Sequence, residues 1–353
     1  MQSLWNDTEA AGFPGDLPSR IYTSRLLGRD KSLVLHGGGN TSVKIRERDL
    51  LGREETILYV KGSGWDLEHI EAAGFSPVRM DRLVGLSKLE RLSDPQMVNE
   101  MRTHMLRADA PTPSVEAILH AIMPFKYVDH THSDAVLALC NTADGEQRIR
   151  ELYGDVVVVI PYVMPGFDLA RLAAEIFPRE ATPRTIGMVL LNHGIFSFGE
   201  TARESYERMI ALVDQAEKAL APEKPTASVS PSSGPVRRDL AALRRDVSTA
   251  AGRPMIVATH QDPVSLAFAR RADVAAISTR GPATPDHVLR TKRIPLVGRD
   301  VQAYAKQYAA YFAEHSATAR EPKKMLDPAP RVIVDRDFGV CTVGNNAKDA
   351  QIV

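Results

Sequence analysis

The stretch YVDHTHSDAVLAL, residues 127–139, decides the fold, because a short strand pattern passes directly into an apolar helical pattern. Alternate residues of a strand point to one face, so we expect His130 and His132 to project together. Two imidazoles placed in this way form a bidentate arm for a zinc-like ion. An ordinary edge strand with two surface histidines gives the same pattern, so the pair alone leaves both interpretations open.

Strand and helix patterns continue on both sides of this stretch and predict an α/β protein. Strands are expected within 33–45, 56–64, 155–166 and 188–199, and helices within 113–123 and 200–220. The segment APEKPTASVSPSSGP, residues 221–235, is rich in Pro, Ser and Ala and is typical of a linker. We therefore expect a catalytic domain over 1–220, a linker over 221–235 and a smaller domain of unknown role over 236–353.

After the linker the pattern restarts as a β-α-β rhythm, which is typical of a small parallel-sheet domain. Helices are expected within 237–251, 263–272 and 300–317, and strands within 254–260, 274–279 and 331–344.

The amino-acid composition limits the classes of protein to which this chain can belong. The 353 residues are 44% hydrophobic and 25% charged, the balance of a soluble globular protein. Lys plus Arg number 44 and Asp plus Glu number 44, so charge indicates neither a nucleic-acid nor an anionic-membrane partner. The first residues do not resemble a signal peptide, and no apolar run is long enough to span a bilayer. Together with Cys140 and Cys341, interpreted as reduced structural thiols, this predicts a cytoplasmic protein.

Two further polar residues stand in apolar surroundings. His193 ends the apolar run MVLLN, residues 188–192, at a Gly turn, and it is either a ligand or a satisfied core residue. Glu116 lies in the apolar run of residues 113–123, where a buried carboxylate needs a partner such as a metal or a proton to transfer. A glutamate favoured by a helix N-terminus is the other interpretation. His120, one turn later, is expected to pack or to hydrogen-bond.

Two Gly-rich turns, GGGNTS at 37–42 and KGSG at 61–64, expose backbone amides beside hydroxyl and amide side chains. Such turns can hold a phosphate or a carboxylate. Neither turn matches a P-loop or the dinucleotide-binding fingerprint.

Taken in order, the motifs GNTS, KGSG, PSVE, HTH, PY and NHG resemble those of the class II aldolase/adducin family over residues 20–220. The segments at 128–139, 198–210, 284–292 and 326–330 are also similar to bifunctional rhamnulose-1-phosphate aldolase/alcohol dehydrogenase proteins. The printed sequence ends before a nucleotide-binding Gly-rich βα unit, so we expect no dehydrogenase activity from it.

The resemblance implies a role for each site residue. It implies Zn²⁺ or another divalent metal on His130, His132 and His193, with Glu116 as the catalytic acid/base. It implies that Tyr162 is a proton donor to the site of a neighbouring subunit. The residues that match the phosphate cradle are Asn40, Thr41, Gly62, Ser63 and Ser114.

One position departs from the phosphate aldolases, which have two adjacent serines before the glutamate. This chain has Ser114 followed by Val115, so one hydroxyl for the phosphate is missing. Either another group compensates or the substrate is not a 1-phosphate. Arg290 and Lys292 are candidate compensators, and a solvated basic turn is the other interpretation of them.

The resemblance implies a three-layer α/β/α fold with a largely antiparallel sheet, followed by a smaller βαβ domain, in a homo-tetramer. The expected reaction is the cleavage of a ketose 1-phosphate, best L-rhamnulose 1-phosphate to dihydroxyacetone phosphate and L-lactaldehyde. A 4-epimerase, a dehydratase, or an aldolase of an unphosphorylated ketose or sugar acid are the alternatives, with an adducin-like interaction protein behind them. As a proton carrier, Glu116 is expected to have a raised pKa in its apolar surroundings.

Overall fold

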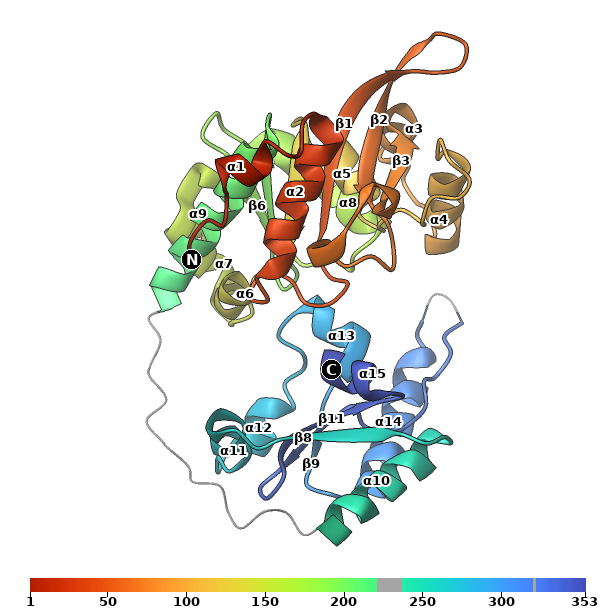
Figure 1. Ribbon diagram of the computed structural model, residues 1–353, viewed down its shortest axis with the longest axis vertical. Coiled ribbons are helices and arrows are strands. Elements are labelled where there is room, and N and C mark those ends of the chain that lie inside the picture. The colour runs from red at the N-terminus through yellow and green to blue at the C-terminus, as the bar shows by residue number, and fades with distance from the viewer. Residues whose placement is uncertain (221–236, 320–321) are drawn as a thin grey trace. The chain divides into compact units, whose positions relative to one another are not determined.

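The computed structural model describes residues 1–220, 237–319 and 322–353 (Figure 1). The chain divides into two compact units, one of residues 1–222 with 283–286, the other of residues 223–282 with 287–353. The predicted linker, 221–235, lies outside the described residues. The short segment 283–286 belongs to the first unit, although the residues before and after it in the sequence belong to the second unit.

A seven-stranded sheet forms the centre of the first unit, in the order β3-β2-β1-β4-β7-β6-β5. The strands are β1 (Asn40–Arg48), β2 (Glu54–Lys61), β3 (Phe75–Arg79), β4 (Tyr127–Thr131), β5 (Val157–Ile160), β6 (Gly187–Leu190) and β7 (Gly194–Gly199). Neighbouring strands are antiparallel except for the parallel pair β5 and β6. The expectation of a largely antiparallel sheet is confirmed.

Helices cover both faces of this sheet, so the first unit has the expected three layers (Figure 1). On one face α3 (Met80–Leu86), α4 (Asp94–Thr103), α5 (Ala117–Ile122) and α8 (Phe167–Glu180) share a core with the sheet. On the other lie α2 (Asp16–Arg29), α6 (Asp134–Cys140), α7 (Gly145–Tyr153) and α9 (Ala202–Leu220). The remaining elements are α1 (Asp7–Ala10) and the 3₁₀ turns η1 (Leu67–His69), η2 (Ala72–Gly74) and η3 (Gly154–Val156).

Strand alternation sorts the sheet residues between the two cores. In β5, Val158 and Ile160 pack on the face of α5 and α8, while Val157 and Val159 pack on the face of α6 and α9. A strand buried on both faces reads as the continuous apolar run VVVI at 157–160. The same alternation governs β4, which carries the candidate metal ligand His130 and leads directly into His132.

Two boundaries differ from those predicted for the first unit. Residues 33–35 were expected to begin a strand, but the backbone amides of Leu33 and Val34 bond to the carbonyl of Asp30, in a turn after α2. The strand starts only at Asn40. The helix expected from residue 113 begins at Ala117, which makes Glu116 its N-cap residue.

The second unit is built on a smaller sheet in the order β8-β11-β10-β9. Its elements are α10 (Arg237–Ala251), β8 (Ile256–His260), α11 (Pro263–Ala269), α12 (Val274–Ser278), α13 (Pro285–Thr291), β9 (Leu296–Val297), α14 (Val301–Ser316), β10 (Val332–Asp335), β11 (Gly339–Gly344) and α15 (Ala347–Ile352). The first residues of α13, up to Asp286, belong to the first unit. A β-α-β element is present, because β9 and β10 are parallel and α14 connects them.

Two predicted strands of the second unit take other forms. The strand expected at 274–279 is the helix α12, in which the amides of Ala276 and Ile277 bond to the carbonyl of Asp273. The single strand expected at 331–344 is a hairpin of β10 and β11. Its turn forms because the carboxylate of Asp335 accepts the amides of Asp337 and Phe338, and Gly339 supplies a positive φ.

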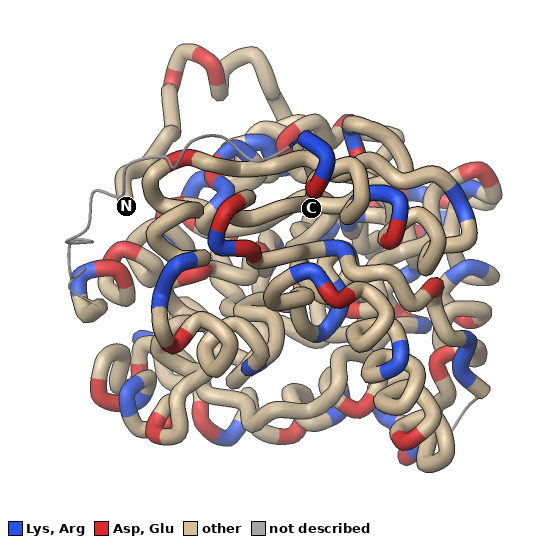
Figure 2. The backbone as a smooth tube through the Cα atoms, turned by 90° about the horizontal axis from the view of Figure 1, so that it is seen from below, with Lys and Arg blue, Asp and Glu red and all other residues tan. Residues whose placement is uncertain are grey.

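Acidic and basic residues are interspersed along the described chain (Figure 2). Among the described helices, none combines the length and apolar character that crossing a membrane requires.

Candidate metal and active site

His130 lies on β4, and His132 is the first residue after this strand. The two side chains project to the same face of the sheet, as strand alternation predicts. The register pairs His130 with Asn40 on β1 and with Phe196 on β7, so it lies in the middle of the sheet. Its ring stacks on Phe196 with centroids 4.2 Å apart. The Nε2 atoms of His130 and His132 are 3.0 Å apart, and both side chains are buried.

His193 joins this pair from the turn between β6 and β7, so the structure brings together all three histidines that the sequence singled out. Their candidate ligand atoms lie within 4.8 Å of one another. The chain can turn so tightly here because Asn192 adopts a positive φ of 58° and Gly194 follows His193. A Cβ on Gly194 would lie 2.4 Å from the carbonyl oxygen of Thr131 and 2.9 Å from the His130 ring, so any larger residue would displace the ligands.

The outer nitrogens of two of these rings determine which nitrogen faces the site. Nδ1 of His130 donates to the carbonyl oxygen of Ile195 at 3.1 Å. Burial lowers the pKa of His130 well below its usual value, so the ring is neutral and Nε2 carries a lone pair. Nδ1 of His132 lies 2.6 Å from the Asp286 carboxylate, which can only accept, so Nδ1 of His132 carries a proton and Nε2 is the nitrogen that faces the site. The Nε2 atoms of the two rings face each other across 3.0 Å.

Glu116 completes the cluster from the N-cap of α5. Its Oε1 lies 3.3 Å from Nε2 of His193 and its Oε2 lies 3.5 Å from Nε2 of His130. Among the described residues Oε1 has no hydrogen-bond donor, although the side chain is only 5% exposed. A buried carboxylate oxygen and converging imidazole lone pairs are the set that a divalent cation satisfies, so these residues fit a metal ion.

The pKa of Glu116 differs from the sequence-based expectation. Burial raises the pKa of Glu116, as expected, but the hydrogen bond from the Asn40 amide and the neighbouring histidines in their protonated form, His130 foremost, lower it, and the net shift is downward. The carboxyl is therefore ionised at neutral pH. In the resting site it is therefore a base.

A chain of buried hydrogen bonds fixes the position of this carboxylate. Nδ2 of Asn40 donates to Oε2 of Glu116 at 2.6 Å and to Oγ of Ser114 at 3.1 Å. Nε2 of His120 bonds to Oδ1 of Asn40, and Nδ1 of His120 lies 2.8 Å from Oγ of Ser42. Burial lowers the pKa of His120 to about 3, so it is a neutral hydrogen-bonding residue, as predicted.

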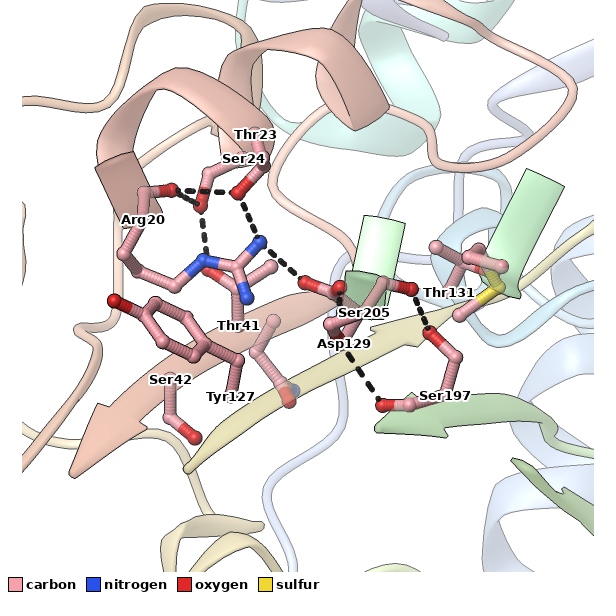
Figure 3. A network of polar contacts seen from close by, with 12 residues as sticks. Arg20, Thr23, Ser24, Thr41, Ser42, Tyr127, Asp129, Thr131, Ser197 and Ser205 are labelled. Atoms are coloured by element: carbon pink, nitrogen blue, oxygen red, sulfur yellow. Dashed lines mark hydrogen bonds and ion pairs between the residues drawn. The ribbon is translucent and has the colours of Figure 1, made fainter. Parts of the chain in front are cut away.

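The predicted phosphate cradle is only partly assembled. Asn40 and Ser114 lie beside Glu116. The backbone amides of Gly62 and Ser63 are already used, by the carbonyls of Gly74 and Thr112. The Thr41 hydroxyl lies on the opposite face of the sheet, 2.7 Å from Oγ of Ser24 (Figure 3), so the structure does not bring it to the site.

Lys61, the first residue of the KGSG turn, joins the two Gly-rich turns. Its Nζ donates to the carbonyl oxygen of Gly37 at 2.9 Å, and the side chain is 6% exposed. Burial lowers the pKa of Lys61 to about 8, partly offset by Asp286, Asp66 and Glu116. Lys61 is thus a buried cation whose charge is held only weakly, and sequence reasoning did not single it out.

Other sequence candidates are exposed or bonded elsewhere. Tyr162 is 54% exposed in the loop after β5, and Val115 is 46% exposed. Lys292 donates to the carbonyl of Asp327 and stacks on Tyr308 at 4.0 Å, inside the second unit. It is therefore engaged elsewhere in the described structure, and it does not replace the missing serine hydroxyl.

One residue that contacts a candidate metal ligand was not predicted from the sequence. Asp286 lies in the segment TPDHVLRTK, residues 284–292, which the sequence singled out for its resemblance to the bifunctional proteins and for its basic residues, but not for Asp286. No local pattern connects it with His132, because 154 positions separate the two residues.

Residues 19–220 match the family described as the class II aldolase and adducin N-terminal domain. The chain belongs to this family. Residues 236–353 match a second family, described as the second domain of class II aldolases.

Individual relatives agree with this membership. The chain is 41% identical to the N-terminal class II aldolase domain of a conserved protein from Thermoplasma acidophilum, over 62% of this chain and 99% of that one, with a TM-score of 0.57. It is 30% identical to a protein named "Uncharacterized oxidoreductase YuxG" from Bacillus subtilis (strain 168), over 98% of this chain and 53% of that protein. The chain thus spans about half the length of that relative.

Class II aldolases use a divalent metal, and the buried group of His130, His132 and His193 could bind one. The family also contains epimerases, so membership alone does not determine which reaction the chain catalyses.

Proposed function

We propose that this chain is a metal-dependent aldehyde-lyase that cleaves a ketose 1-phosphate. L-rhamnulose 1-phosphate, giving dihydroxyacetone phosphate and L-lactaldehyde, is the first substrate to test. The observation that carries the proposal is the convergence of three histidines on a buried glutamate whose Oε1 has no donor among the described residues. Such a site provides a cation and a base side by side.

The cation that fits this site is Zn²⁺ or another divalent ion held by His130, His132 and His193. When bound, it supplies Lewis acidity that stabilises the negative charge of an ene-diolate. All other roles in the proposal fall to side chains of the chain itself.

Glu116 is proposed to move the proton at the carbon beside the ketose carbonyl. Because the carboxyl is ionised, it can accept this proton in the direction of synthesis. In cleavage the same carboxyl returns the proton to the ene-diolate carbon. Asn40 holds Oε2, which leaves Oε1 as the oxygen that faces the substrate.

Two further groups are assigned by proposal. Tyr162 handles the proton on the aldehyde oxygen, and its exposure suits a role in the site of a neighbouring subunit of a homo-oligomer. Lys61 and Ser114 bind the anionic end of the substrate, next to the Gly-rich turn of residues 37–39.

One observation favours a second candidate, an aldolase of an unphosphorylated ketose or sugar acid. Val115 replaces a serine of the phosphate aldolases, and the amides of Gly62 and Ser63 are occupied by carbonyl groups of the chain. Fewer donors are then available to a phosphate dianion than in the phosphate aldolases. Epimerisation and dehydration would use the same carboxylate and differ in their products.

A retro-aldol assay with added Zn²⁺ tests the proposal, by comparing L-rhamnulose 1-phosphate with free L-rhamnulose. We expect cleavage of the phosphate, and a Glu116→Gln variant should be slower by about 10²–10⁴-fold while it still binds metal. Glu175→Gln, at an exposed position of α8, is the matched control and should keep full activity. Full activity in Glu116→Gln contradicts the assignment of Glu116. Inactivity of the wild-type protein on both ketoses, with metal bound, contradicts the aldolase reaction and favours epimerisation or dehydration.

A further inference from the structure

Asp286 is a buried acidic residue that contacts one of the three histidines of the candidate metal site. The segment 283–286 belongs to the first compact unit, and Asp286 is 2% exposed. The amide of Asn141 donates to the carbonyl of Ala283 at 2.9 Å and anchors the segment. Asp286 is thus held in place by contacts within the unit that contains the histidines.

Both oxygens of this carboxylate have a defined donor. Oδ1 accepts from Nδ1 of His132 at 2.6 Å, and Oδ2 accepts from the backbone amide of Leu35 at 2.8 Å. The Gly-rich turn makes room for it, because a Cβ on Gly38 would lie 1.8 Å from Oδ1. The turn that the sequence suggested as an anion cradle therefore already holds an anion of the chain itself.

In the hydrogen bond between His132 and Asp286, the donor and the acceptor are defined. A carboxylate can only accept, so it fixes the proton of His132 on Nδ1 and turns the Nε2 lone pair toward His130. The hydrogen bond also increases the basicity of the ring as a ligand. In addition, Asp286 and Glu116 bring two negative charges to three histidines, which matches the charge of one divalent cation.

We propose that Asp286 is a positioning residue that orients His132 for binding of the divalent metal, in a carboxylate–histidine–metal arrangement. His130 is oriented more weakly, by the neutral carbonyl of Ile195. His132 is therefore the ligand whose binding depends on a charged partner. This inference rests on the metal site of the proposed function, and it does not depend on which substrate the site takes.

Zinc titration of the full chain, freed of metal by a chelator, tests the inference in Asp286→Ala and Asp286→Asn. We expect the Kd for Zn²⁺ to rise by about 10–100-fold in Asp286→Ala. The rise should be smaller in Asp286→Asn, because the amide oxygen can still accept from one of the two donors. Asp109→Asn, a change of the same kind at an exposed position of the first unit, should leave the Kd unchanged.

A second measurement separates orientation of His132 from a general effect on folding. The visible absorption of the Co²⁺-loaded protein reports the ligand set, and it should change in Asp286→Ala but not in Asp109→Asn. If Asp286→Ala does not fold, the same comparison is made with Asp286→Asn. An unchanged Kd and an unchanged Co²⁺ spectrum in a folded variant overturn the inference while the metal site stands. Weaker zinc binding in the variant of a protein inactive on ketoses supports the inference and contradicts only the proposed reaction. A wild-type protein that binds no zinc overturns both.

Discussion

The two faces of the β1–β4 strand pair each carry a buried cluster of polar side chains. The two clusters differ in the charged groups that they contain. On one face Asn40 and His130 are register partners and belong to the candidate metal site. On the other face their neighbours Thr41 and Asp129 are also register partners, and they belong to a network with Arg20 of α2 (Figure 3). On each of the two strands, adjacent residues therefore belong to different clusters. One residue belongs to the candidate metal site and its neighbour belongs to the network around Arg20.

The network around Arg20 contains its own counter-charge. The guanidinium of Arg20 forms an ion pair with Asp129, and both side chains are fully buried. Ser205 of α9 donates to the second oxygen of Asp129, and Ser24 and Thr41 share a hydrogen bond. This cluster ties α2 and α9 to the sheet. The histidine face, by contrast, gathers three histidines around a carboxylate whose Oε1 has no hydrogen-bond donor among the described residues, and that difference distinguishes a candidate ligand site from a buried ion pair.

The largest effect is expected from breaking the ion pair. Arg20→Met leaves Asp129 buried without a counter-charge and should lower the free energy of unfolding by about 3–5 kcal/mol. Both tryptophans, Trp5 and Trp65, lie in the first unit, so their fluorescence in a denaturant titration follows this unit alone. Arg29→Met, an exposed change on the same helix, should cost little. The folded Arg20→Met variant should still bind zinc, and loss of metal from a folded variant would show that the two faces are not independent.

A smaller effect is expected from changing the strand neighbours Asn40 and Thr41. Asn40→Ala removes a hydrogen bond to the Glu116 carboxylate and should lower kcat by about 10–100-fold, since bonds to charged groups contribute about 1.5–3 kcal/mol. Thr41→Val removes only the bond to Ser24 and should cost about 1 kcal/mol of stability with unchanged kcat. Steady-state kinetics and denaturant unfolding of both variants measure this. Equal losses of kcat would contradict the separation of the faces.

The smallest effect is expected in the pH dependence of kcat/KM. Burial lowers the pKa of Lys61 from 10.5 to about 8. The protonated form binds the anionic substrate, so kcat/KM for the ketose phosphate should be constant below about pH 8. Above it, kcat/KM should fall by up to about tenfold per pH unit. Lys61→Met should remove this dependence, and a flat profile in the wild-type protein between about pH 7 and 10 would exclude Lys61 from substrate binding.

The sequence predicted those features of the site that depend on local periodicity. Alternation placed His130 and His132 on one face, and the order of family motifs added His193 and Glu116 to them. The same alternation also separates Thr41 from Asn40, although both had been assigned to the phosphate cradle. Strand alternation should therefore be applied to every residue of a motif before all of them are assigned to one site.

Other features depend on contacts between distant parts of the chain. The Gly62 and Ser63 amides are occupied by carbonyls of Gly74 and Thr112, and no local pattern announces such pairing. Asp286 reaches His132 from a segment far along the sequence. The apolar run at 274–279 is short enough to suit either a strand or a helix, and the structure forms the helix α12 there.

A crystal structure of the zinc-soaked protein, with anomalous diffraction measured on both sides of the zinc absorption edge, tests the metal site most directly. The account predicts one strong anomalous peak, at about 2.0–2.1 Å from the Nε2 atoms of His130, His132 and His193. Oε1 of Glu116 should lie beside this peak, and the carboxylate of Asp286 should remain on Nδ1 of His132. A protein that binds zinc elsewhere, or whose three histidines stay without a peak at saturating zinc, would contradict the account.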